Sequence, residues 1–253
     1  MFKRIKVSQI NDHIWLMDDN NEGTGYLVTG SERGLIIDTM NGFENVKALA
    51  ETLTDLPLTV VNTHGHPDHF YGNIYFEQAY LHPADIPLAE AYYQKHLFQK
   101  EAEKSGLKLA EFLPVEEGMC FDLGGMALEV YEVPGHTPGG IVLLDRKDRI
   151  LFTGDSINVH TWMQLPESLP MKEFLISLKK VQSLRDSFDY ILTGHSHKLV
   201  KASFCDAHIR AVEEVCNGEN EKDQPYTWFE GTCMAHPYGD IIKIVYEDVE
   251  KSV

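Results

Sequence analysis

THGHPDH, residues 63–69, places three histidines and one aspartate within seven residues. Side chains at positions i and i+2 of an extended segment point to the same side, so we expect His64 and His66 to reach one common centre. Asp68 and His69 follow where the chain begins to turn, and they are placed to face another centre. Because imidazoles and carboxylates are metal ligands, this stretch predicts part of a metal site whose other ligands lie elsewhere in the chain.

Single coordinating residues of the same kinds follow other strand-like segments. His136 lies in PGHTPGG, Asp155 in FTGDS and His195 in LTGHSH, and in each motif a glycine turns the chain after an apolar run. Loops at strand ends, held by a rigid sheet, are common positions of catalytic groups. Imidazoles and carboxylates without thiolates suit zinc, and also iron or manganese.

Apolar alternation and turn residues predict strands at residues 13–18, 25–28, 34–38, 58–62, 79–82, 126–133, 140–144, 149–152, 190–192 and 241–246. Helical patterns cover residues 45–53, 84–112, 172–185 and 205–216. No linker-like tract of Gly, Pro or Ser separates the two strand-rich halves. We therefore predict one α/β domain over residues 1–253, in which two sheets pack together with helices outside.

The composition limits the class of partner. The 253 residues carry a formal net charge of −17, and 43% of them are hydrophobic, which is enough to bury a sizeable core. Nucleic acids and anionic membrane surfaces are bound through Lys and Arg, so this acidity disfavours both. We expect a small-molecule substrate and neither nucleic acid nor a membrane as partner, while the sequence leaves the oligomeric state open.

The thiols and the N-terminal residues indicate the compartment. MFKRIKVSQINDHIW lacks the long apolar core of a secretory signal. Cys120, Cys205, Cys216 and Cys233 are scattered without a CxxC pair, which is typical of reduced thiols. We expect a cytoplasmic protein.

The ordered set His64-x-His66-x-Asp68-His69, His136, Asp155 and His195 resembles the metallo-β-lactamase-fold hydrolase superfamily. The resemblance covers motifs from Asp38 to His195 and implies an αββα sandwich with two metal ions at one edge of the sheets. By this resemblance one ion would be bound by His64, His66 and His136, the other by Asp68, His69 and His195, and both by a bridging Asp155. Asp38, in LIIDT, matches a position that usually supports these ligands. His197 is an alternative to His195, which the resemblance favours.

Within the superfamily, some branches fit this sequence poorly. True lactamases usually lack a bridging aspartate at the position of Asp155 and are normally exported. The flavodiiron branch normally has a carboxylate where His66 stands and carries a flavin domain. The nuclease branch usually needs a surface for polyanionic RNA, which an acidic chain does not offer.

Glyoxalase II-like thioesterases, lactonases and small phosphodiesterases remain, so the resemblance implies a metal-dependent hydrolase that is not a true β-lactamase. Hydroxide held between two divalent ions, zinc ahead of iron or manganese, would cleave a small ester, thioester or lactone. Asp68 would orient the nucleophile and carry its proton towards the leaving group. The alternatives are a small phosphodiesterase of the same fold and a persulfide-oxidising dioxygenase with one iron. A non-catalytic binding module is a further hypothesis, but it predicts lost ligands, and none is lost.

Two segments are candidates for the wall around the site. The loop at residues 156–170 follows Asp155 and carries His160, Trp162 and Met163; we predict that His160 and Trp162 contact the substrate. The helical stretch at residues 84–112 carries Tyr92, Tyr93 and Phe98. Packing on the sheets and a role as a lid are equally open for this second segment.

Overall fold

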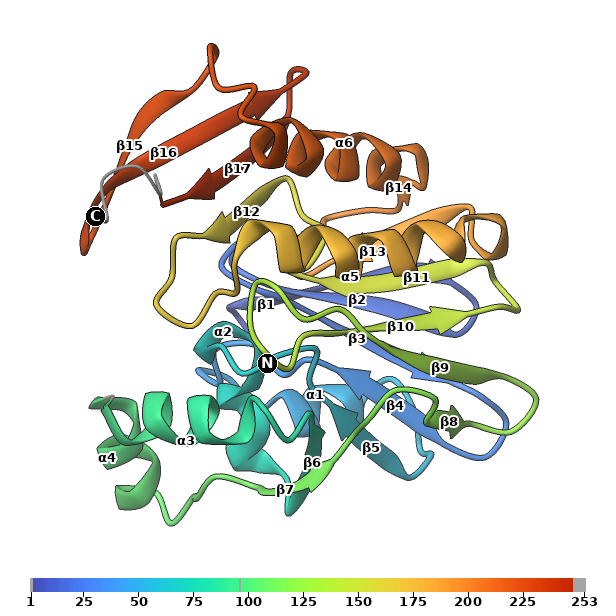
Figure 1. The fold of residues 1–253 in the computed structure, drawn as a ribbon. Helices are drawn as coiled ribbons and strands as arrows, with labels where there is room; N and C mark the ends of the chain where they lie inside the picture. Colours follow the sequence, from blue (N-terminus) through green and yellow to red (C-terminus); the bar gives the residue numbers. More distant parts are fainter. Residues whose placement is uncertain (1, 96, 248–253) are drawn as a thin grey trace.

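Two central sheets lie face to face with helices on their outer surfaces (Figure 1). The computed structural model describes residues 2–95 and 97–247. The first sheet runs in the order β1-β2-β3-β4-β5-β6-β7, with bounds β1 (Ile5–Asn11), β2 (Ile14–Asp19), β3 (Thr24–Thr29), β4 (Gly34–Ile37), β5 (Leu58–Val61), β6 (Gln78–Leu81) and β7 (Glu111–Pro114). Its strands pair antiparallel from β1 to β4 and parallel from β4 to β7.

The second sheet runs in the order β14-β13-β11-β10-β9-β8. Its bounds are β8 (Cys120–Asp122), β9 (Ala127–Glu132), β10 (Ile141–Asp145), β11 (Ile150–Gly154), β13 (Tyr190–Thr193) and β14 (Val200–Lys201). Strands β11 and β13 are parallel, and β9 runs in the same direction because β10 pairs antiparallel with both β9 and β11. The loops that follow β9, β11 and β13 therefore leave this sheet at one edge.

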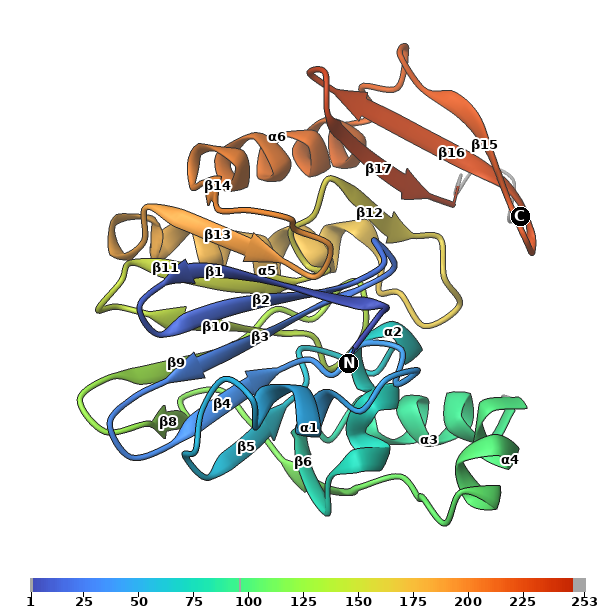
Figure 2. The same cartoon turned by 180° about the vertical axis from the view of Figure 1, so that it is seen from behind.

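The helices form the outer layers of the sandwich. Their bounds are α1 (Val46–Ala50), α2 (Pro67–Phe70), α3 (Ile86–Lys95), α4 (Leu97–Lys104), α5 (Met171–Ser183) and α6 (Ser203–Asn217), with 3₁₀ turns η1 (Tyr71–Tyr75) and η2 (Arg185–Ser187). Figures 1 and 2 show α1, α3 and α4 on the side of the first sheet and α5 and α6 on the side of the second. The predicted αββα sandwich is confirmed.

Side-chain alternation along the strands builds the core between the layers. In β4, Leu35 and Ile37 face the second sheet and pack with Leu143 and Phe152, whereas Ile36 packs outwards with Val46 and other residues of α1. Successive side chains of a strand point to opposite faces, so an apolar run with helices on one face and a sheet on the other is buried on both.

A third sheet was not predicted. It runs in the order β12-β17-β16-β15, with bounds β12 (His160–Met163), β15 (Gln224–Trp228), β16 (Gly231–Tyr238) and β17 (Ile242–Tyr246), and it packs against α6. The prediction of residues 156–170 as a loop is wrong at β12. This short strand pairs in parallel with β17, which lies far along the chain, and local sequence does not show such pairing.

The helical prediction for residues 84–112 is confirmed for α3 and α4 but wrong at its end. Phe112 belongs to β7, because Glu111–Pro114 extends the first sheet by pairing with β6. Tyr93 packs into a buried cluster with Phe70 and Leu81, while the side chain of Phe98 lies outside the described residues.

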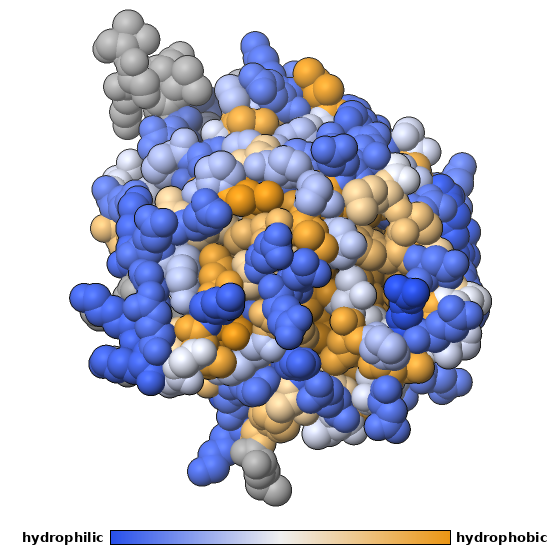
Figure 3. Space-filling model, turned by 90° about the horizontal axis from the view of Figure 1, so that it is seen from below, coloured by the Kyte–Doolittle hydropathy of each residue, from blue (hydrophilic) through white to orange (hydrophobic). Residues whose placement is uncertain are grey.

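Charged residues make up 24% of the chain, and most of them lie at the surface. Figure 3 shows hydrophilic side chains over most of one face, with hydrophobic residues visible in the recesses between them. Across residues 2–95 and 97–247, no helix has the length and apolar character needed to cross a bilayer.

Candidate metal centre

The structure brings all of the predicted ligands to one edge of the sandwich. They come from the turn after β5 and from α2, and from the loops after β9, β11 and β13: His64, His66, Asp68, His69, His136, Asp155 and His195. Ligand atoms lie within 4.8 Å of one another in three sets, which are His64–His66–His136, His64–His69–Asp155 and Asp68–His69–His195. The first and last sets match the two groups that the resemblance implied.

The first group consists of imidazoles. Nδ1 of His66 lies 2.9 Å from Nε2 of His136, and the ring centres of His64 lie 4.7 Å and 5.0 Å from those of His66 and His136. His64 and His66 sit on the extended turn just before α2, and His66 is the residue that precedes its first turn. The spacing of i and i+2 therefore directs both rings to one point.

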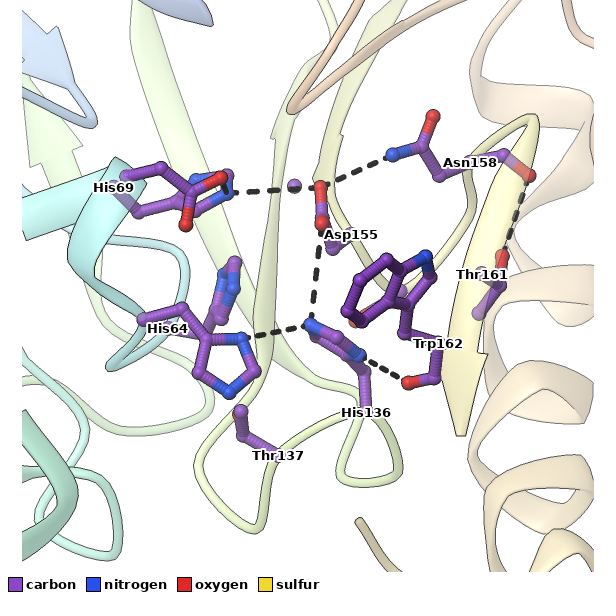
Figure 4. A network of polar contacts seen from close by, with 12 residues as sticks. His64, His69, His136, Thr137, Asp155, Asn158, Thr161 and Trp162 are labelled. Carbon is purple, nitrogen blue, oxygen red and sulfur yellow. Dashed lines mark hydrogen bonds and ion pairs between the residues drawn. The ribbon is translucent and has the colours of Figure 1, made fainter. Parts of the chain in front are cut away.

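Asp155 lies between this group and the other one (Figure 4). Its Oδ2 is 3.1 Å from Nε2 of His195 and 3.9 Å from Nε2 of His136, and its Oδ1 is 3.7 Å from Nε2 of His69. Oδ2 of Asp68 completes the second group at 3.5 Å from His69 and 3.6 Å from His195. One carboxylate thus reaches imidazoles of both groups.

Acceptors behind the imidazoles fix which nitrogen carries the proton. Nδ1 of His69 donates to Oδ2 of Asp38 at 2.8 Å, and Nδ1 of His136 donates to the Trp162 carbonyl at 2.6 Å. Nε2 of His66 donates to Oε1 of Glu167 at 2.8 Å. In each ring the other nitrogen is left with its lone pair directed into the site, which is the arrangement that metal-binding histidines require.

His64 is oriented in the same way through a hydroxyl. Oγ1 of Thr63 donates its proton to Asp38 Oδ2 at 2.8 Å, and it accepts a hydrogen bond from Nδ1 of His64 at 3.0 Å. Asp38 thereby orients two rings, one directly and one through Thr63. It does so with a φ of +60°, a conformation that Asp tolerates better than most residues and that concentrates at functional sites.

Sequence reasoning missed two of these acceptors. Glu167 also accepts a hydrogen bond from the Tyr92 hydroxyl at 2.8 Å, so it connects α3 to His66. The Trp162 contact comes from a backbone carbonyl, which no side-chain motif reports. Glu167 follows Asp155 and β12 in the chain, but no spacing rule marks it, because its partner His66 lies 101 residues earlier, in the turn after β5.

Glycine permits the close approach of the last ligand loop. A Cβ at Gly194 would lie 2.2 Å from Oδ1 of Asp155 and 2.6 Å from Cε1 of His69. Any larger residue before His195 would push these ligands apart.

The electrostatics of the site favour cations. Burial opposes a charge on His69, but Asp68, Asp38 and Asp155 outweigh it and raise the pKa of His69 well above its usual value. Burial, followed by the neighbouring imidazoles, lowers the pKa of His64 well below its usual value and that of His136 to about 4. The imidazoles of His64 and His136 are therefore neutral, and a cation at Nε2 of His69 would replace the proton that the carboxylates attract there, which makes the set suitable for divalent metal ions.

Unpartnered atoms support the same conclusion. Nε2 of His64 and Nε2 of His69 are buried and make no hydrogen bond. Buried polar atoms almost always have a partner, and these two nitrogens belong to the candidate ligand sets, so each is available to bind a metal ion. The residues present fit a metal centre.

A cavity of about 450 Å³ opens over these ligands. His160 and Trp162 both line it, because alternation along β12 turns them towards the cavity and turns Thr161 and Met163 into the core. Tyr92 of α3 lines the same cavity. Met163 therefore does not belong to the predicted wall.

Four further histidines of the described residues belong to none of the three ligand sets at this site. His197 is 55% exposed and faces Asp18 at 3.6 Å, outside the ligand sets of the described residues. His13 pairs with Asp148, and His236 is buried between Asp223 and Glu214. His82 pairs with Glu132, and His96 lies outside the described residues.

Comparison with known proteins identifies the family. The model of the metallo-beta-lactamase superfamily matches residues 20–211. The chain belongs to this superfamily. The match spans every ligand named above, and it confirms the predicted family and the prediction that this superfamily member is an enzyme, a hydrolase.

Among curated relatives of this superfamily member, the acyl-coenzyme A thioesterase MBLAC2 of Gallus gallus is 28% identical over 204 residues, which cover 70% of this chain and 74% of that protein. The hydroxyacylglutathione hydrolase of Erythrobacter litoralis is 30% identical over 218 residues, which cover 81% of this chain and 78% of that protein. Both similarities extend over most of each chain.

Solved structures show the same fold. The DIM-1 metallo-beta-lactamase superposes with a TM-score of 0.64 at 16% identity, over 84% of this chain and 99% of that one. The structure of TTHA1623 in a di-iron-bound form gives a TM-score of 0.56 at 29% identity, over 74% of this chain and 93% of that one. Members of the superfamily generally bind divalent metal ions, and this chain carries candidate ligands for them.

Proposed function

We propose that this hydrolase is a thioesterase with two divalent metal ions at its active site. The observation that carries the proposal is the position of Asp155, whose oxygens face imidazoles of both ligand groups at 3.1–3.9 Å. A carboxylate shared by two groups is suited to bridging two ions, and seven candidate ligands exceed the four positions of one tetrahedral ion.

One ion would be held by His64, His66 and His136. The other would be held by Asp68, His69 and His195, and Asp155 would be shared by both ions. Such a pair supplies Lewis acidity, which polarises a carbonyl and lowers the pKa of water. Zinc suits this donor set, and iron and manganese compete for it. The similar structure of TTHA1623 is titled a di-iron-bound form, so the metal has to be measured in this protein.

Asp68 is the acid–base residue of the proposal. Its side chain is 31% exposed and lines the cavity, unlike the buried His69 beside it. Desolvation opposes its ionisation, but His69 and His195 lower the pKa of Asp68 to about 2. It is therefore a carboxylate at neutral pH, placed to accept a proton from the attacking water and to pass it to the departing thiolate.

The relatives support a thioester as the substrate. One is named an acyl-coenzyme A thioesterase, and the other is named for hydrolysis of an acylated glutathione. An ester or lactone shares the same acyl carbonyl and remains within the chemistry of the site. No feature of the described residues favours a phosphodiester or a persulfide over these acyl compounds.

The compartment and partners stay predictions. The cysteines of the structure are free, which supports a reducing compartment such as the cytoplasm. A small-molecule substrate fits the size of the cavity, which lies within the range of ligand pockets.

Metal analysis of the purified protein, followed by a panel of thioester, lactone, phosphodiester and β-lactam substrates, tests the proposal. We expect two ions per chain and the highest kcat/KM on thioesters. His195→Ala should lower both the metal content and turnover, and the matched variant His197→Ala should change neither. One ion with full activity, or a clear preference for phosphodiesters, would overturn the proposal.

A further inference from the structure

The turn between β15 and β16 lies at the mouth of the active-site cavity. Trp228 pairs with Gly231, so Phe229 and Glu230 form a two-residue turn at the end of this hairpin. Figures 1 and 2 show this end of the hairpin on the side of the molecule where α2 and β12 lie. Phe229 lines the cavity together with His66 and Asp155, although it comes from a segment beyond the residues that match the family.

Aromatic contacts fix the hairpin end to the wall of the site. The ring centre of Trp162 lies 6.0 Å from that of Trp228 and 6.3 Å from that of Phe229, and the rings of Trp228 and Phe229 are 4.7 Å apart. The carbonyl of Trp162 in turn accepts a hydrogen bond from His136. The hairpin is thus connected to a metal ligand through one residue.

Phe229 lines the cavity and is nevertheless 78% exposed, so its ring is open to an apolar group of a bound molecule. Val159, also on the cavity wall, is 45% exposed. Leu165 and Trp162 continue this apolar side of the cavity.

The charge of the cavity wall indicates which part of a substrate enters. Among the described residues that line the cavity, none is a lysine or arginine. The phosphates of a large thiol carrier would find no cationic side chain there, whereas an apolar group would bury its surface against Phe229, Trp162 and Leu165.

We propose that the end of the β15–β16 hairpin forms the acyl-binding wall of the active site and that Phe229, held by its contacts with Trp228 and Trp162, selects thioesters with an apolar acyl group. The proposal rests on the proposed thioesterase function. The acyl chain lies along Phe229, Trp162 and Leu165 with its carbonyl at the metal ligands, while the thiol part leaves the cavity towards solvent.

Acyl thioesters of N-acetylcysteamine test this, because the thiol part is then small, neutral and constant. We expect Phe229→Ala to lower kcat/KM about tenfold for the hexanoyl thioester and only about twofold for the acetyl thioester, since the lost contact is with the distal part of the chain. Ile241→Ala is the matched control: Ile241 is 61% exposed beside the same sheet and does not line the cavity. It should leave both rates unchanged.

Equal effects of Phe229→Ala on the hexanoyl and acetyl thioesters would overturn the proposal and leave the thioesterase function standing. If the wild type cleaves no thioester, binding decides instead. The dissociation constant for hexanoate, measured by quenching of tryptophan fluorescence, should then be at least about tenfold lower for the wild type than for Phe229→Ala. That result would support the acyl-binding wall and reject the thioesterase function. Equal binding by the two proteins would reject both.

Discussion

At the scale of single residues, the proposal of two metal ions depends on Asp155. We expect Asp155→Asn to lower the metal content from two ions per chain towards one and to reduce kcat by more than about 100-fold, because an amide bridges two cations poorly. Mass spectrometry of the metal content, alongside thioester kinetics, measures both. A variant that retains two ions and normal turnover would show that Asp155 does not bridge.

Glu167 contacts His66 and acts through it, so its removal should lower the metal affinity more than the kcat of the metal-loaded enzyme. Burial acts to raise its pKa, but hydrogen bonds from His66 and Tyr92 outweigh burial and lower the pKa of Glu167 to about 2. Glu167→Ala should reduce metal affinity about 10- to 100-fold, with partial rescue in Glu167→Gln, whose amide oxygen still accepts from His66. Glu173→Ala, an exposed glutamate on α5, is the control in competitive chelator titrations. Equal affinities in all of these proteins would contradict the assigned role.

At the scale of elements, β12 connects the metal ligands to the third sheet and carries the predicted substrate contacts. Trp162→Ala keeps the carbonyl that orients His136 but removes the indole from the cavity wall. We expect changed relative kcat/KM values among acyl substrates with unchanged metal content. Trp15→Ala, a similarly half-buried tryptophan on the first sheet, should leave these ratios unchanged. If Trp162→Ala scales every substrate equally or unfolds the protein, β12 is not a specificity element.

Helix α6 contributes an acid-sensitive contact to the same strand. His208 is fully buried, its Nε2 contacts Thr161 Oγ1 at 2.8 Å and its Nδ1 has no partner. Burial lowers the pKa of His208 to about 3, against 6.5 when the chain is unfolded. Above pH 6.5, His208 is neutral in both states and the free energy of unfolding keeps its full value. As the pH falls from 6.5 towards 3, only the unfolded chain binds a proton at His208, so the free energy of unfolding decreases.

The pH dependence of unfolding measures this loss. Between about pH 6 and pH 4, the free energy of unfolding should fall about 1.4 kcal/mol per pH unit more steeply in the wild type than in His208→Gln. Denaturant titrations at each pH give the two slopes, and the other histidines affect both proteins alike. His197→Gln, at an exposed position, should follow the wild type. Parallel slopes for wild type and His208→Gln would mean that His208 is already protonated in the folded state.

At the scale of the whole molecule, activity should depend on metal and not on thiols. Chelators should abolish turnover, and added divalent ions should restore it. Alkylation should reach exposed Cys120 first and spare most activity, because Cys205 and Cys233 are buried and no cysteine of the described residues lines the cavity. Trapping of a covalent acyl-enzyme would contradict a mechanism in which water attacks directly.

The sequence by itself determined the candidate metal ligands and the packing of two sheets with helices outside. His64 and His66 at i and i+2 on an extended turn, and His136, Asp155 and His195 after apolar strands, are local patterns that depend only on strand periodicity and turn residues. The alternating and continuous apolar runs, such as β4 and β10, likewise predict two sheets with buried faces. These features depend on residues that are close together in the chain, so they could be predicted from the sequence alone.

Only the tertiary structure decided what surrounds the ligands. Glu167 reaches His66, the Trp162 carbonyl reaches His136, and β12 pairs with β17 across contacts between residues far apart in the chain. The turn at Phe229 likewise lies over the cavity because the third sheet packs on α6, not because of anything in its own four or five neighbouring residues. Such contacts form when separate elements pack together. Local propensity and periodicity do not predict which distant element will be the partner.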